Sequence, residues 1–159
     1  MANTQSMCTS FLGELLSSTH NFSSANPAHT ANTADTFKAA LYLASATINA
    51  STTAYSATNE VSGTGYTAGG VTVTNATNPT STNSSTTAGV GYWTPSASIT
   101  YTTVTLTTAF DCVLIYNSSQ SNKAVSAHTF GSQTVTAGTF TLTMPANTTS
   151  TALLRLATT

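Results

Sequence analysis

The stretch that decides the fold runs from Ile99 to Tyr116 and reads ITYTTVTLTTAFDCVLIY. Two of its segments, Ile99–Leu106 and Cys112–Tyr116, are rich in β-branched and aromatic residues, which is the composition of short strands. Threonine suits the half-buried face of a pleated sheet and is disfavoured in helices. The stretch therefore predicts two β-strands.

The rest of the chain repeats this pattern of short apolar runs and turns. Phe37–Leu43 alternates well enough for a half-buried strand, and the other predicted strands are Val71–Thr74, Ala124–Phe130, Thr134–Met144 and Thr151–Leu156. Turn signals separate them at Asn117–Ser119, Gly131–Ser132, Ala137–Gly138 and Pro145–Asn147. This spacing predicts an all-β fold in one domain, residues 1–159: an antiparallel β-sandwich or barrel, jelly-roll-like, with one short N-terminal helix.

That helix is predicted at residues 6–18, with Ser6 as its N-cap. Apolar residues recur there at helical spacing, at Cys8, Phe11, Leu12, Leu15 and Leu16. A helix of about three turns is marginal alone, so we expect it to lie on something apolar.

Charge is scarce throughout the sequence. The 159 residues include three basic and four acidic side chains but 37 threonines and 21 serines. Soluble domains usually keep about a quarter to a third of their surface charged, whereas burying an ion against a neighbour costs several kcal/mol. The composition therefore favours a component of an assembly, and a small, under-charged sheet protein is the alternative.

The same composition excludes several classes. Three basic residues cannot build a phosphate-binding surface or a polybasic membrane patch, so we expect no nucleic-acid and no membrane partner. The longest apolar runs are far shorter than the roughly 20 residues that cross a bilayer, and no leader peptide is expected.

No motif in the sequence carries chemistry. The ionisable residues are scattered, without metal-ligand spacing, a nucleophile elbow or a P-loop, so we expect no enzyme, no catalytic residue, no cofactor and no metal. His20 and His29 are interpreted as surface or capping residues and His128 as a strand residue. Cys8 and Cys112 favour two buried thiols over one disulfide.

The stretch 75–91 is the lowest in complexity and is predicted to be an exposed Thr/Ser-rich loop. The candidate partner contacts in and after it are Thr82, Asn83, Tyr92 and Trp93. An exposed Tyr–Trp pair suits a protein interface or a sugar, although a lone Trp is more often in the core. Thr-x-Thr pairs raise ice binding as a further alternative, but their spacing is irregular.

Two stretches, Asp35–Tyr42 and Thr52–Gly70, resemble a family of short structural proteins encoded by tailed bacteriophages. Further segments that fit the family are Phe11–Leu16, His20–Phe22, Leu114–Asn117, Asn122–Val125 and Phe140–Leu156. The resemblance covers most of the chain and weakens between Asn75 and Ile99. It implies a virion protein without catalytic residues, assembled in the cytoplasm of a host bacterium.

The size and the scarce charge of the chain favour one position within the virus particle over others. A small, uncharged, autonomously folding chain suits a decoration (cement) protein on the capsid exterior, which binds the major capsid protein as a homo-oligomer, with a trimer favoured. A tail-associated fibre, tip or adaptor protein is the alternative, and a non-viral carbohydrate- or ice-binding module comes third. Residues with expected structural roles are Phe11, Leu15, Phe37, Leu41, Glu60, Tyr66 and Ile115. Glu60 and Lys38 are expected to pair or to cap turns.

Overall fold

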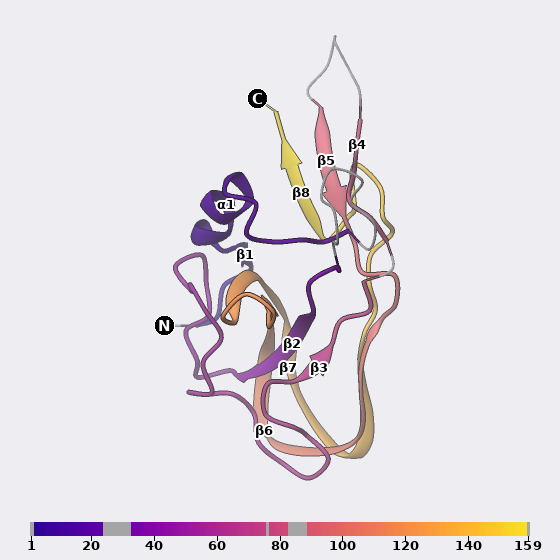
Figure 1. Cartoon of the computed structure of the whole chain (residues 1–159). Helices are drawn as coiled ribbons and strands as arrows, with labels where there is room; N and C mark the ends of the chain where they lie inside the picture. Colours follow the sequence, from indigo (N-terminus) through magenta and orange to yellow (C-terminus); the bar gives the residue numbers. More distant parts are fainter. Residues whose placement is uncertain (1, 24–32, 76, 83–88, 159) are drawn as a thin grey trace.

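The computed structural model describes residues 2–23, 33–75, 77–82 and 89–158 (Figure 1). In chain order the elements are β1 (Ser6–Met7), α1 (Thr9–Leu16), β2 (Phe37–Leu43), β3 (Val71–Thr72), β4 (Thr80–Ser81), β5 (Val90–Trp93), β6 (Ile99–Asn117), β7 (Lys123–Leu142) and β8 (Leu154–Ala157). The prediction of an all-β fold with one short N-terminal helix is confirmed.

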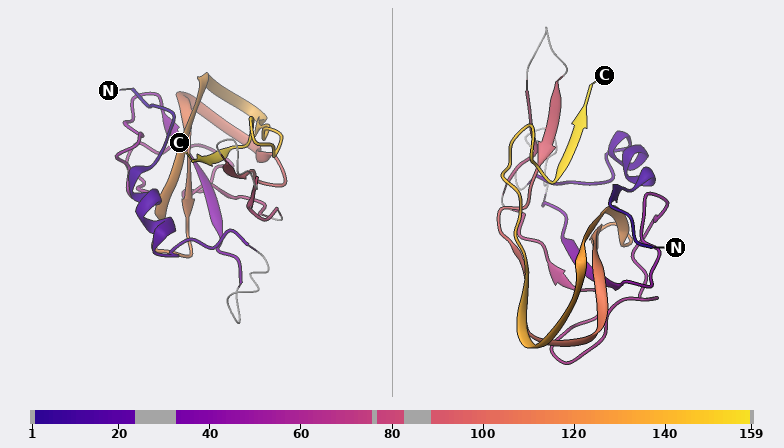
Figure 2. Two further views of the ribbon diagram at one scale, coloured as in Figure 1. Left: turned by 90° about the horizontal axis from the view of Figure 1, so that it is seen from above. Right: turned by 180° about the vertical axis from the view of Figure 1, so that it is seen from behind.

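The strands form two antiparallel sheets. The larger has five strands in the order β1-β7-β6-β2-β3, and the smaller has three in the order β4-β5-β8. Figures 1 and 2 show the small sheet at one end of the molecule and the curved β6–β7 hairpin at the other. Across the described residues the arrangement is of the sandwich type and no sheet closes into a barrel.

β6 and β7 are longer than predicted, with 19 and 20 residues. The predicted turns at Gly131–Ser132 and Ala137–Gly138 lie inside β7, where the β6–β7 register shifts. Ala137 has a positive φ of 46° there, and its N–H donates a hydrogen bond to the Thr105 hydroxyl. Turn-forming residues therefore mark β-bulges here, because a bulge and a turn need the same backbone freedom.

β2 occupies the predicted residues but is buried on both faces rather than half-buried. It lies between β6 and β3, and the segment that follows it covers its second face, where the Tyr42 hydroxyl donates to the Ser56 carbonyl. Gly70, with a φ of 70°, passes so close to the strand that a Cβ there would overlap the Ala39 carbonyl oxygen. Close backbone approach, made possible by glycine, therefore encloses β2.

The helix is shorter than the predicted span of residues 6–18. Ser6 and Met7 pair with β7 as strand β1, and the N-cap is Cys8, which makes no side-chain capping bond. Ser6 is therefore not the cap. A two-residue strand takes these positions because the edge of β7 offers backbone partners that a helix turn would leave unused.

Only part of the predicted apolar face of α1 is covered. Phe11 is fully buried and Leu15 is partly buried, but Leu12 is 44% and Leu16 is 92% exposed. An eight-residue helix meets the sheet along one narrow stripe, and at about 3.6 residues per turn the next stripe points about 100° away. The helix thus lies on the apolar core, as expected, through Phe11 and Leu15, and its Leu12 and Leu16 side chains stay exposed.

The stretch 75–91 is not a simple loop. β4 lies in it and pairs with β5, with Thr80 opposite Tyr92 and Ser81 opposite Gly91. The stretch thus contributes the strand of a hairpin at the end of the molecule, while residues 76 and 83–88 lie outside the described residues.

Both cysteines are buried and free, as the sequence predicts. Burial raises the pKa of the Cys8 thiol to about 11 and that of the Cys112 thiol to about 12. Neither thiol is poised for nucleophilic chemistry, because the thiolate is the reactive form.

Candidate interaction surface and the network that holds it

An apolar groove lies between α1 and the small sheet. It is open to solvent on one side and has a cavity volume of about 140 Å³. Helix and edge-strand residues form one wall, and β5 and β8 form the other. The lining residues are Met7, Phe11, Leu15, Phe22, Pro79, Thr80, Gly91, Tyr92, Trp93, Leu154 and Leu156. None of them is Asp, Glu, Lys, Arg or His, so the groove suits an uncharged, apolar surface.

Of the exposed large apolar side chains in the described residues, one lines this groove and two lie on the next stripe of the helix that forms its wall. Among the described residues they are Leu12, Leu16 and Leu156. Leu156 is 44% exposed and lines the groove itself. Leu12 and Leu16 form the helix stripe that adjoins Leu15, which also lines it. Exposed apolar patches of this kind mark interaction sites more often than isolated surface leucines do.

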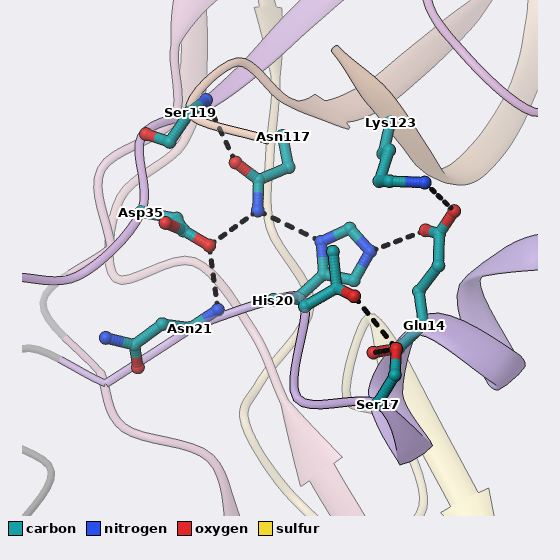
Figure 3. Close-up of polar contacts among 9 residues, drawn as sticks. Glu14, Ser17, His20, Asn21, Asp35, Asn117, Ser119 and Lys123 are labelled. Atoms are coloured by element: carbon teal, nitrogen blue, oxygen red, sulfur yellow. Dashed lines mark hydrogen bonds and ion pairs between the residues drawn. The ribbon is translucent and has the colours of Figure 1, made fainter. Parts of the chain in front are cut away.

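A buried polar network fixes the helix that forms one wall (Figure 3). The Asn117 side-chain oxygen accepts the Ser119 backbone N–H at 3.0 Å, which orients the amide. Its nitrogen then donates to Asp35 at 2.7 Å and to Nδ1 of His20 at 3.0 Å. Because Nδ1 accepts, the His20 proton lies on Nε2, which donates to Glu14 at 2.7 Å.

Glu14 completes the connection from the helix to β7. Its second oxygen accepts the Lys123 ammonium at 2.8 Å. Burial acts to raise the pKa of Glu14, but the hydrogen bonds from Lys123 and His20 outweigh it, so the pKa is lowered from its ordinary value. The ionised carboxylate therefore ties α1 to both the β6–β7 turn region and the loop that carries His20.

His20 is buried, contrary to the expectation of a surface or capping residue. Its side chain is 0% exposed and lies 4.9 Å from Phe11 between ring centroids. Its two ring nitrogens are both used within the fold, so no substrate can reach them. His29, which had the same interpretation, lies outside the described residues. His128 is in β7, as expected, and burial lowers its pKa to about 4.

Aromatic rings form the floor between this network and the groove. Phe22 stacks on Phe37 with centroids 4.3 Å apart and meets Trp93 edge-on at 4.9 Å. Trp93 is 2% exposed, and its indole N–H is shared between the Asn75 side chain and the Thr77 carbonyl. The candidate role of Trp93 as an exposed partner contact is therefore wrong, because its ring and its donor are both needed inside.

The other candidate contacts have different positions. Tyr92 is partly exposed and lines the groove. Thr82 follows β4 and is exposed, and its hydroxyl oxygen accepts a hydrogen bond from the Val90 N–H. Asn83 lies outside the described residues. Of the predicted set, Tyr92 and Trp93 thus both line the groove, and only Tyr92 is partly exposed there.

A second buried carboxylate, Glu60, closes the far side of β2. It accepts hydrogen bonds from the Tyr55 hydroxyl at 2.6 Å, and from the Tyr66 hydroxyl and the Gly69 N–H at 2.7 Å. Burial and then the bond to Glu60 raise the pKa of both tyrosines. Glu60 caps the glycine-rich turn, as expected, and the remaining predicted structural residues lie in or against the core: Phe11, Leu15, Phe37, Leu41, Tyr66 and Ile115.

Sequence reasoning did not find the Glu14–His20–Asn117–Asp35 network, because its members are up to 103 positions apart. The signal that could have found it is the scarcity of charge, since each retained ion in such a sequence calls for a partner. Among the described residues no group of three or more His, Cys, Asp or Glu side chains is arranged to hold a metal ion. No helix there has the length and apolarity to span a membrane.

Comparison of the chain with known protein families, with curated proteins and with solved structures finds no match in any of the three.

Proposed function

We propose that this protein is a structural component of a bacteriophage virion, and specifically a decoration protein that binds the major capsid protein on the outside of the shell as a homo-oligomer, with a trimer favoured. The observation that carries the proposal is the uncharged apolar groove at one end of the molecule, bordered by exposed leucines and by the β4–β5 hairpin. A non-enzymatic binding role fits such a surface.

The few charges support the same role. Glu14 and Lys123 pair with each other, Glu60 is buried among tyrosines, and Asp35 and Asp111 accept hydrogen bonds from asparagines. Most of the seven charged side chains thus serve the fold, and the surface is left to hydroxyl groups. Hydroxyl groups lose less free energy than ions when a neighbour covers them, so this surface suits permanent contacts in an assembly.

A tail-associated protein is the second candidate. The hairpin of β4 and β5 stands at the end of the molecule (Figures 1 and 2), where a neighbouring subunit could contact it. The carbohydrate alternative loses its main support, because Trp93 is buried. Ice binding is disfavoured by the five register shifts along β6–β7, which interrupt any regular threonine array.

The test is the number of copies of this chain per purified virion, measured by quantitative mass spectrometry against the major capsid protein. We expect hundreds of copies. A count in the single digits to tens assigns the chain to the tail or neck, and its absence from purified particles overturns the virion proposal.

A further inference from the structure

The strand β8 has two features that would let a further strand pair with it, an open edge and side chains that alternate between the groove and the other face. It is at the edge of the small sheet, with β5 on one side and, in the part of the chain that the structure describes, no strand on the other. Figures 1 and 2 show that this open edge faces α1. Unpaired backbone groups at an edge are a template for pairing with another chain.

The side chains of β8 alternate in the way this binding requires. Leu154 and Leu156 line the groove, and Arg155 between them points to the other face of the sheet because successive side chains alternate. A strand paired with β8 would place every second side chain in the groove, against Leu15 and Phe22. Backbone bonds would supply affinity and the groove would supply specificity.

We propose that the groove binds an extended segment of a partner chain, which adds to the small sheet beside β8 and carries the pattern apolar–acidic–apolar. Its apolar residues fill the groove and its carboxylate lies beside Arg155. This inference rests on the proposed function only in that it takes the protein to be part of an assembly.

Charge selects the acidic residue at the centre of that segment. Arg155 is exposed and makes no ion pair with any described residue. The groove lining is uncharged, so an ion in the partner segment is tolerated only at the outward position, where Arg155 is the nearest ion on β8. A carboxylate meets that requirement and an ammonium is repelled.

Charge also favours a different chain, rather than a second copy of this one, as the occupant of the groove. The four carboxylates of the chain belong to Glu14, Asp35, Glu60 and Asp111, and all are engaged in internal hydrogen bonds. The one apolar–acidic–apolar triplet, Phe110–Cys112, is within β6 and buried at both apolar positions. A folded second copy therefore has no segment of the required kind to offer.

The experiment is a titration of the ¹⁵N-labelled full chain with capped heptapeptides, followed by amide chemical shifts. The probe is Thr-Thr-Val-Asp-Leu-Thr-Thr. One comparison peptide has Lys in place of Asp, and another has Ser at both apolar positions. We expect saturable shifts of the Leu154–Ala157 amides with the probe and none with the Ser peptide.

Arg155→Glu should weaken binding of the probe about two- to fivefold and strengthen binding of the Lys peptide by a similar factor. Thr107→Glu, at an exposed position of β6, is the matched control and should change neither.

Absence of saturable shifts at β8 with the probe overturns the proposal. So does a dimer that dissociates on dilution and is abolished by Leu156→Ser, because it assigns the groove to a second copy. The proposed function fails separately: a chain that binds the probe but is absent from virions keeps this inference and loses the virion assignment, and the reverse outcome does the opposite.

Discussion

Two regions of the molecule differ in how completely their polar groups and strand edges are paired. Around β2 every strong polar group of the Glu60 cluster is paired, and glycine lets the loop close over the strand. At the small sheet, β8 keeps an open edge and an apolar groove beside exposed leucines. On our proposal, the large sheet serves as the scaffold and the small-sheet end as the surface that meets a partner.

The largest effect should come from the aromatic core of the scaffold. Phe37 is 0% exposed and stacks on Phe22, so Phe37→Ala should lower the free energy of unfolding by about 3–5 kcal/mol through loss of burial and creation of a cavity. Chemical denaturation measures this. Leu16→Ala, at a 92% exposed position, is the control and should stay within about 0.5 kcal/mol. Equal losses for the two variants would contradict the distinction between scaffold and surface.

The second effect is the pH dependence of stability that comes from the large sheet, in which β7 carries His128. The unfolded chain takes up a proton at His128 near pH 6.5, whereas burial delays this in the folded chain to about pH 4. The unfolded state then binds more protons between these values, so stability is full above pH 6.5 and falls as the pH drops towards 4, by on the order of 3 kcal/mol.

Thermal melts of the native chain and of His128→Gln at several pH values test this. The variant should lose the decrease in stability between pH 6.5 and 4 that His128 causes. It should keep only the decrease that protonation of carboxylates causes. Glu14 belongs to that part: its lowered pKa gives stability that is present above its ordinary value of 4.5 and lost below it. Identical pH profiles for the two proteins would show that His128 is not buried in its neutral form.

The smallest of the three effects concerns the helix beside the groove. Glu14→Gln removes the charge that accepts hydrogen bonds from Lys123 and His20, which should cost about 2 kcal/mol. Hydrogen exchange should become faster in α1 and stay unchanged in β6 and β7. Lys123→Met is the comparison variant, and because the Lys123 side chain is 38% exposed its effect should be smaller. Uniform acceleration of exchange across the chain would show that the network serves the whole fold and not the helix alone.

Much of the scaffold follows from local patterns. The alternation in Phe37–Leu43 and the β-branched runs of Ile99–Tyr116 predict β2 and β6 because strand periodicity is a local property. The turns predicted at Gly131–Ser132 and Ala137–Gly138 are bulges inside β7, because the same residues permit either structure and only pairing with β6 distinguishes the two.

The surface is harder to predict because it depends on which parts of the chain meet. The spacing of Leu12 and Leu16 gives a helix face, but only the position of the sheet decides that the Phe11 stripe is covered and theirs is not. Likewise the residues that hold α1 in place come from four separate segments. The sequence is compatible with Trp93 either in the core or at a contact. Its indole N–H donates to Asn75 and to the Thr77 carbonyl, both in the stretch predicted to be a loop, and these bonds hold the ring in the core.

The most direct test of the small-sheet end as the binding surface is the occupancy of a Leu16→Lys variant on purified virions. Leu16 is 92% exposed, and a cation near a helix C-terminus is tolerated, so the variant should melt like the native chain. We predict that it joins particles in markedly fewer copies, while Thr107→Lys, an exposed change in β6, joins at full occupancy. Full occupancy of both variants would contradict the assignment of this end of the molecule as the contact with the particle.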